Sequence, residues 1–244
     1  MDNITTIALS RLVAQQRATD VIATNLANSA TPGFHAERML FSDWLQKAPA
    51  GGNGRGSIAF TQDRATYRDP QTGPLQPTGN PLDLAITGDG YFSVQTPAGV
   101  RLTRAGHFGL NAAGNIVDGQ GHTLLDSNGQ PLLLAATDTN LTISADGSIR
   151  SSNGVVGRIG VVMPTSPQAL RSEGGLLSVA SGPTAPVAAP KLVQGAVEGS
   201  NIQPTVELTR MMNGLREFQF TSEMVQAEAD RQQSAIDKLT QPRN

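Results

Sequence analysis

The sequence contains no cysteine, so disulfide bonds, thiolate metal sites and a cysteine nucleophile are excluded, and the redox compartment is left open. No apolar run approaches the roughly 20 residues that cross a bilayer, so direct membrane insertion is not expected. The first residues, Met1 to Thr6, carry neither a basic region nor an apolar stretch, so we expect no cleavable secretory signal peptide.

Charged residues make up only 16% of the chain, and the formal net charge is −2. A nucleic-acid-binding protein would show a basic stripe, and none is present, so we expect no nucleic-acid partner. Aromatic residues are 4% of the total, which also argues against a carbohydrate-binding platform.

Signatures of chemistry are scarce. The chain has neither a G-x-G-x-x-G nor a G-x-x-x-x-G-K-[ST] loop, and its three histidines lack the short spacing of a zinc pair. The segment from Asp126 to Gly129 has no downstream glutamate to complete a calcium loop, so we interpret it as a turn. Two of the four aspartates Asp83, Asp89, Asp118 and Asp146 could in principle form a glycosidase pair, but the last three adjoin turn glycines. We therefore predict no enzyme and no catalytic, cofactor-binding or metal-binding residues.

Glycine and proline are unevenly distributed along the 244 residues. Of the 26 glycines, 24 lie between Gly51 and Gly199, and no proline occurs before Pro32 or between Pro204 and Pro242. Both ends are therefore permissive for helices, whereas the middle is interrupted every few residues. This pattern predicts an α+β fold. Long N- and C-terminal helices pack together as a coiled coil, and an antiparallel all-β domain, sandwich-like or barrel-like, is inserted between them in the sequence.

The C-terminal segment shows the clearest periodicity. It predicts a helix from about Thr205 to Thr240, roughly 50 Å long at ~1.5 Å per residue. Uncharged residues recur at alternating steps of three and four, and the charged residues, Glu207 included, are expected off this stripe. A helix of this length exceeds the width of a small domain, so its stripe needs a second helix. The stripe comprises Leu208, Met211, Leu215, Phe218, Ser222, Val225, Ala229, Gln232, Ile236 and Leu239.

The N-terminal segment can supply that second helix, ending near Asn28. Its seam is more polar, so we expect the helix to be marginal in water without a partner. Pro32-Gly33 favours a type II turn over Thr31–Phe34, because proline fixes φ and glycine accepts a positive φ. The seam comprises Ile4, Ala8, Leu12, Gln15, Thr19, Ile22 and Leu26, and the expected anchors after the turn are Phe34, Met39, Leu40, Phe41, Trp44 and Leu45.

The middle of the chain has the pattern of short strands. Alternating or apolar runs at 82–86, 91–94, 100–103 and 141–143 are separated by glycine-containing turns, and residues 155–163 are expected as a later strand. We expect this body to extend over about 77–164, followed by a proline- and alanine-rich linker at 181–190 and a returning strand at 191–197. The resulting division is 1–45, N-terminal helix and anchor; 46–76, loop or extended connector, with 47–57 flexible; 77–180, β-rich domain; 181–204, linker and return strand; and 205–244, C-terminal heptad helix.

Four blocks of sequence resemble the bacterial flagellar rod and hook protein family. They appear in the order typical of the family and span nearly the whole chain. Thr31-Pro32-Gly33-Phe34 is similar to the form found in proximal-rod members, and residues 46–67 lack the long insertion of distal-rod members. The first block consists of Gln15-Gln16, residues 20–28 and residues 31–34, and the others are residues 78–92, 102–106 and 198–202.

The resemblance implies a structural subunit of the flagellar rod. Members of this family leave the cell through the flagellar type III export apparatus, pack their terminal helices in the inner tube and expose the β domain in the periplasm. The partners implied are other proximal and distal rod proteins and copies of the same chain. The residues expected at the assembly interface are Ile4, Ala8, Leu12, Ile22, Asn25, Leu26, Asn28, Pro32, Gly33, Phe34, Leu208, Met211, Leu215, Phe218, Val225, Ile236 and Leu239.

Two other interpretations remain open at this stage. One is a distal-rod or hook-type subunit of the same family, which a copy count in basal bodies would distinguish. The other is a periplasmic glycan-binding or hydrolytic protein built on the β domain, which would need a pocket of convergent polar groups.

Overall fold

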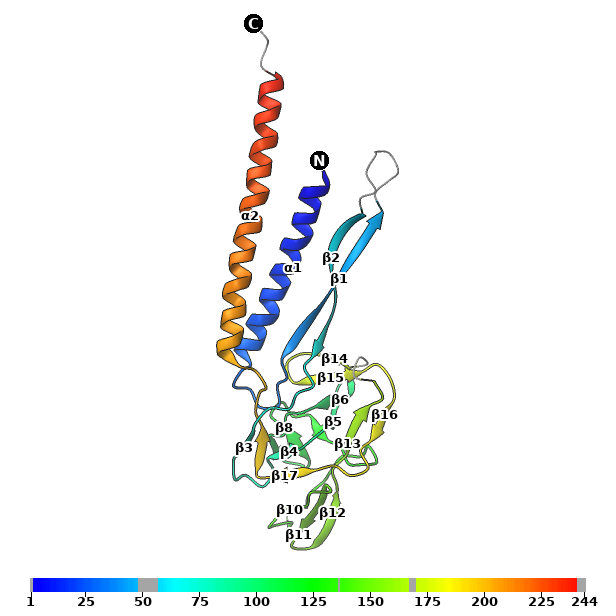
Figure 1. The fold of residues 1–244 in the computed structure, drawn as a ribbon. Coiled ribbons are helices and arrows are strands. Elements are labelled where there is room, and N and C mark those ends of the chain that lie inside the picture. Colours follow the sequence, from blue (N-terminus) through cyan, green and yellow to red (C-terminus); the bar gives the residue numbers. More distant parts are fainter. Residues whose placement is uncertain (1, 48–56, 136, 167–169, 241–244) are drawn as a thin grey trace. The chain divides into compact units, whose positions relative to one another are not determined.

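The computed structural model describes residues 2–47, 57–135, 137–166 and 170–240. The chain divides into two compact units, each described here by itself (Figure 1). The helical unit contains residues 1–27, 37–66 and 203–244, and the β unit contains residues 28–36 and 67–202.

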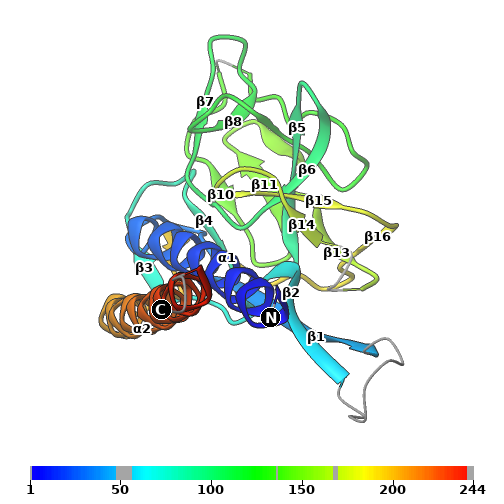
Figure 2. The same ribbon diagram turned by 90° about the horizontal axis from the view of Figure 1, so that it is seen from above.

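In the helical unit, helix α1 (Asp2–Ala27) contacts helix α2 (Pro204–Thr240), and both views show the two helices side by side (Figures 1 and 2). Pro204 occupies the first position of α2, where its missing N–H costs nothing, and the N–H groups of Val206 and Glu207 donate to the carbonyl of Gln203. Both predicted helices are therefore confirmed, with ends within a residue or so of those expected.

Strands β1 (Glu37–Lys47) and β2 (Ser57–Arg68) form a two-stranded sheet, and β1 contacts α1. The sequence did not predict β2, which lies in the segment expected as a loop or extended connector. Of the expected anchors in this region, Met39 is half-buried and Leu40 is 50% exposed, which corrects the expectation for Leu40. The described part does not include the side chains of Phe41, Trp44 and Leu45. It also does not include most of the expected loop at 47–57.

The β unit consists of short antiparallel strands. Its largest sheet follows the order β14-β15-β6-β5-β9-β8-β7, with β13 paired to both β5 and β16, and smaller sheets are β10-β11-β12, β17-β4 and β18-β3. The strands are β3 (Leu75–Pro77), β4 (Leu84–Ile86), β5 (Tyr91–Thr96), β6 (Gly99–Thr103), β7 (Phe108–Leu110), β8 (Ile116–Asp118), β9 (Thr123–Leu124), β10 (Thr142–Ile143), β11 (Ser148–Ser151), β12 (Gly154–Arg158), β13 (Val161–Pro164), β14 (Leu170–Ser172), β15 (Leu177–Ala180), β16 (Thr184–Pro186), β17 (Leu192–Gln194) and β18 (Ala196–Glu198).

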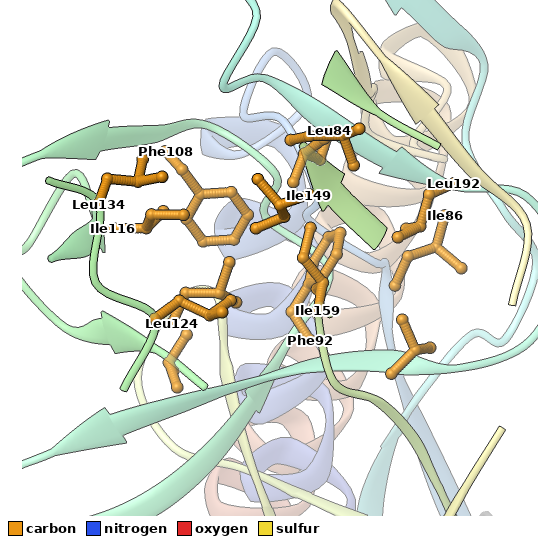
Figure 3. Close-up of a cluster of buried hydrophobic side chains, with 14 residues drawn as sticks. Leu84, Ile86, Phe92, Phe108, Ile116, Leu124, Leu134, Ile149, Ile159 and Leu192 are labelled. Atoms are coloured by element: carbon orange, nitrogen blue, oxygen red, sulfur yellow. The ribbon is translucent and has the colours of Figure 1, made fainter. Parts of the chain in front are cut away.

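One apolar core joins the largest sheet to the β10-β11-β12 and β17-β4 sheets (Figure 3). Phe92 and Phe108 lie at its centre, with ring centroids 5.3 Å apart and an interplanar angle of 89°, an edge-to-face arrangement. Leucine, isoleucine and valine side chains from the surrounding strands complete the cluster, and Leu192 joins it from the far end of the unit's sequence. The inserted antiparallel β domain is thus confirmed.

Three strand expectations need correction. The single strand at 155–163 is interrupted between β12 and β13, because Ile159 instead forms a bridge with Asp126. The expected linker at 181–190 contains β16, which pairs with β13. The returning strand at 191–197 is divided at Gly195, whose φ of 75° breaks it into β17, paired with β4, and β18, paired with β3.

Candidate assembly interface

The side of α2 that packs on α1 is marked by its reduced exposure. Thr221 is buried, Phe218 is at the margin with 38% exposure, and the Thr19 hydroxyl of α1 lies 3.8 Å from the position of a Cβ on Gly214. The positions recur at steps of four and three, as expected for a heptad contact between two helices. This inner face comprises Glu207, Met211, Gly214, Phe218, Thr221, Val225, Glu228 and Gln232.

The stripe predicted from the sequence is split between this inner face and solvent. Met211, Phe218 and Val225 belong to the inner face, whereas every second member of the stripe points away from α1. Leu208, Leu215 and Ile236 are 45%, 47% and 53% exposed. The Leu239 side chain lies outside the described part.

The exposed members belong to a second heptad row, which we call the outer stripe. The first eight of its residues each follow an inner-face position by one residue, which is a rotation of about 100° around the helix, and Ile236 continues the row. All nine are exposed and none is charged: Leu208, Met212, Leu215, Gln219, Ser222, Gln226, Ala229, Gln233 and Ile236. A single helix therefore carries two adjacent faces: the inner face, which α1 covers and which includes Glu207 and Glu228, and the uncharged outer stripe.

Glu207 corrects the expectation that every charge lies off the contact face. Its side chain is 2% exposed, and its Oε1 accepts hydrogen bonds from Arg38 of β1 and Arg210 of α2, both at 2.7 Å. A buried carboxylate needs such charged donors, because burial of an unpaired charge is costly. Glu207 thus joins the first turns of α2 to β1 within the helical unit.

The complementary face of α1 is built from small side chains. Ala8 and Ala14 are buried, while Leu12, Ile22 and Leu26 are half-buried. The Ile4 side chain lies outside the described part. Small residues allow helices to approach closely, but they remove little apolar surface from water.

Asn25, which is predicted at the assembly interface, makes hydrogen bonds within the helical unit. It is 1% exposed, and its amide donates to the carbonyl of Glu37 while its oxygen accepts from the Glu37 N–H, at 2.9 and 2.8 Å. The side chain thereby binds one residue of β1 as a neighbouring strand would, and it fixes the end of α1 to the start of the hairpin.

The turn after α1 lies in the β unit and has the predicted form. The Phe34 N–H donates to the Thr31 carbonyl at 3.2 Å, and Gly33 has a φ of 73°. A Cβ on Gly33 would lie 2.4 Å from the backbone nitrogen of Ala105, so only glycine fits. Phe34 is 1% exposed and packs with Ile202, and the Thr31 hydroxyl donates to the Asn28 side chain.

A buried ionic cluster around Glu198 joins residues from blocks that lie far apart in the sequence. The Glu198 carboxylate, 1% exposed, accepts from His35 Nε2 at 2.9 Å, from the Gly73 N–H at 3.0 Å and from Arg104 Nη1 at 3.1 Å. Its backbone carbonyl accepts from the Gly33 N–H at 2.7 Å. Burial alone would raise the pKa of Glu198, but the His35 hydrogen bond and the Arg104 charge hold that pKa below its ordinary value.

Arg104 extends the cluster to a further block. Its Nη2 donates to the Gly88 carbonyl at 2.7 Å, and its guanidinium lies 5.2 Å from the centroid of the Tyr91 ring. Asn201 adds hydrogen bonds to the Ala36 N–H and the Gln71 carbonyl. Each of the four blocks that carry the family resemblance therefore supplies a residue to the Glu198 cluster or to the Thr31–Phe34 turn, which is hydrogen-bonded to Glu198. The sequence did not single out Glu198, Arg104 or His35, although all three adjoin or lie within these blocks.

Two histidines of the β unit pair with aspartates, and both histidines line one hollow of about 240 Å³. His107 Nδ1 lies 2.8 Å from Asp83, and His122 Nδ1 lies 2.8 Å from Asp118. Among the residues that the structure describes, no three histidine or acidic side chains converge as metal ligands would. Asp126 accepts from the N–H groups of Asn128 and Gln130, which confirms the turn predicted there.

The predicted interface residues thus fall into two groups. Those of α1 and α2 meet in the helical unit, partly on the inner face and partly on the outer stripe. Asn28, Pro32, Gly33 and Phe34 belong to the β unit, where Gly33 and Phe34 are buried in its own packing. Contact of either group with another subunit stays a prediction.

Comparison with known protein families gives three matches along the chain. Residues 6–35 match the flagella basal body rod protein family, residues 85–151 match the flagellar hook protein FlgE/F/G D1 domain, and residues 193–238 match the flagellar basal body rod FlgEFG protein C-terminal family. The matched regions include α1 with its turn, much of the β unit, and nearly all of α2.

Full-length relatives agree with these matches. The chain is 35% identical to the flagellar basal-body rod protein FlgF of Mesorhizobium japonicum over 96% of both chains. It is 32% identical to FlgF of Caulobacter vibrioides over 98% of both chains. It is also 33% identical to the flagellar basal-body rod protein FlgG of Bacillus subtilis, over 86% of this chain and 89% of that protein.

Proposed function

The chain belongs to the FlgE/F/G family of flagellar rod and hook proteins and is a FlgF-type structural subunit of the basal-body rod, and we propose that it occupies the proximal rod and assembles through its terminal helices. Family membership implies assembly with other rod subunits and a structural rather than enzymatic activity. No helix in the described part of the chain has a stretch long and apolar enough to span a membrane.

The observation that carries the proposed mode of assembly is the outer stripe. It runs along a helix of 37 residues, about 55 Å at ~1.5 Å per residue, and it remains exposed although the adjacent inner face of the same helix is covered by α1. Folding of the single chain does not remove the apolar side chains of this uncharged helix face from water. Contact with helices of neighbouring subunits would bury it and would stiffen a shaft that transmits torque.

The proposed neighbours are copies of this chain and other proximal and distal rod proteins. We further propose that the chain is exported through the flagellar type III apparatus without a cleavable signal peptide and that it functions in the periplasmic space. A cysteine-free chain with a weakly packed pair of helices suits passage in an unfolded state, because little packing energy has to be overcome there.

The test replaces a residue of the outer stripe and a neighbour of it. In Leu215→Asp, assembly would bury an unpaired charge at a cost of several kcal/mol, so we expect the protein to be exported but absent from purified basal bodies, with loss of motility. Arg216→Ala is the matched control, because Arg216 is exposed beside the stripe, and we expect it to remain motile.

Normal motility and normal rod content in Leu215→Asp would contradict helix-mediated assembly. The position in the rod is tested separately by the copy number in basal bodies and by its place in a density map. A high copy number in the distal rod or hook would favour the alternative member of the family. Specific binding of peptidoglycan fragments by the purified chain would favour the glycan-binding alternative.

A further inference from the structure

His35 is buried with an oxygen atom opposite each of its ring nitrogens. The residue is 3% exposed. Its Nδ1 lies 2.9 Å from the backbone carbonyl oxygen of Asp69, and its Nε2 lies 2.9 Å from Oε1 of Glu198. Glu198 is itself 1% exposed, so water has little access to the contact between the two side chains. Neither ring nitrogen can therefore exchange its protein partner for solvent while the β unit is folded.

The two oxygen atoms determine how many protons the His35–Glu198 pair holds. A carbonyl oxygen can only accept, so Nδ1 carries a proton. The contact between Nε2 and Oε1 needs a second proton, because two lone pairs would otherwise face each other at 2.9 Å. In water above about pH 7, a histidine and a glutamate side chain together hold one proton, because their ordinary pKa values are about 6.5 and 4.3. The buried pair thus holds one proton more than the same side chains in the unfolded chain.

We infer that the His35–Glu198 pair takes up one proton when the chain folds, so that the stability of the β unit falls as the pH rises above about 7. The inference stands on the geometry of the β unit and does not depend on the proposed function. Although burial raises the pKa of Glu198, the hydrogen bond from His35 and the charge of Arg104 lower that pKa further. Glu198 therefore stays a carboxylate, and the additional proton lies on His35, whose ring forms an ion pair with it.

The other titratable groups around the pair do not produce the same pH dependence. Guanidinium groups keep their charge in proteins, and carboxyl groups titrate in the acid range. Burial raises the pKa of Tyr91 above its ordinary value of 10.0, although its ring lies beside a guanidinium. The charged and titratable groups that surround the pair are Arg68 and Asp69 at the end of β2, Asp89 and Tyr91 at the start of β5, and Arg104 after β6.

The pair lies at the centre of the contacts that hold residues 31–36 in the β unit. On one side of His35, the Gly33 N–H donates to the Glu198 carbonyl at 2.7 Å. On the other side, the Ala36 N–H donates to the Asn201 side chain at 2.8 Å. Loss of the additional proton would leave two acceptors facing each other between these bonds, and such a buried arrangement is costly. Alkaline pH should therefore loosen this segment, which follows α1 and precedes β1 in the chain.

The proton on His35 can be observed by nitrogen-15 NMR of full-length protein labelled at histidine. The imidazolium ring and the two neutral tautomers give different nitrogen shifts, and the chain has three histidines. His107→Gln and His122→Gln identify the other two signals without a change to the buried pair. We expect imidazolium shifts for His35 at about pH 8, where an ordinary histidine is neutral. A neutral His35 ring in the folded protein at this pH would overturn the inference.

The uptake of the proton is measured by the pH dependence of unfolding. A proton that the folded state keeps and the unfolded state releases stabilises the fold fully below the unfolded pKa, and this contribution is lost as the pH rises. Relative to His35→Gln, the wild-type equilibrium constant for unfolding should increase roughly tenfold from about pH 7 to 8. His35→Lys is the matched control, because an ammonium group with a pKa near 10.4 stays charged over this range and should remove the increase.

Chemical denaturation of the full-length chain, followed by circular dichroism through the unfolding of the β unit, gives these equilibrium constants. A constant ratio between wild type and His35→Gln over this pH range would overturn the inference. An equal pH dependence in His35→Lys would also overturn it, because the dependence would then belong to another group. The NMR measurement on wild type decides the question if a substitution at His35 prevents folding.

Discussion

The two units differ in how they remove apolar surface from water. In the β unit, Phe34, Phe92 and Phe108 are at most 2% exposed, and a continuous core joins its sheets. In the helical unit, the only buried apolar residues among the described side chains are Ala8 and Ala14, whereas ten large apolar residues of α1 and α2 are exposed. The β unit thus has the packing of a self-sufficient domain, whereas the helical unit leaves much of its apolar surface exposed.

The largest expected effect is a difference in amide exchange between the units of the free chain. Backbone amides of α1 and α2 should exchange with solvent orders of magnitude faster than those of β5 and β6, because opening the helices exposes little additional apolar surface. Hydrogen–deuterium exchange followed by mass spectrometry measures this. Protection of α1 equal to that of β5 in the monomer would show that the helical unit is stable alone and would remove the basis for the comparison.

A pair of phenylalanine truncations sharpens the comparison energetically. Phe92→Ala should lower the free energy of unfolding of the β unit by about 3–5 kcal/mol, because it leaves a cavity beside Phe108. Phe220→Ala should change the free energy of unfolding by less than about 0.5 kcal/mol, since the Phe220 ring is 71% exposed. Chemical denaturation followed by circular dichroism gives both values. Similar losses in the two variants would contradict the assignment of stability to the β unit.

The smallest expected effect is a pH dependence confined to the β unit. Because folding lowers the pKa of Glu198, its carboxylate stabilises the native state at pH values above its unfolded pKa, and this contribution is lost as the pH falls through the lower, native pKa. Wild type and Glu198→Gln should therefore differ in Tm at neutral pH and converge on acidification below about pH 4. A constant difference in Tm over this range would show that the Glu198 charge does not stabilise the fold.

Local signals in the sequence were sufficient for both helices, for the turn between α1 and the β unit and for some of the strands. The helix limits follow from proline positions and periodicity, and the turn at Thr31–Phe34 follows from the φ preferences of Pro32 and Gly33. The strand β2 and the strand β16 were missed because each depends on a pairing partner, β1 or β13, more than on its own residues.

The candidate site was predictable in part. Heptad spacing identified the uncharged side of α2, but it could not show that Met211 faces α1 while Leu215 faces solvent, because two adjacent faces share one period. Nor could it show that Glu207 is buried, since the arginine that pairs with it, Arg38, lies 169 residues away in the sequence.

The sequence by itself therefore determined where helices and turns form, because these depend on residues within a few positions of one another. The tertiary structure alone decided which charges are buried, as in the Glu198 cluster, and which half of the α2 stripe remains exposed. Those outcomes depend on which distant groups come within hydrogen-bonding or packing distance, and only the folded chain brings them together.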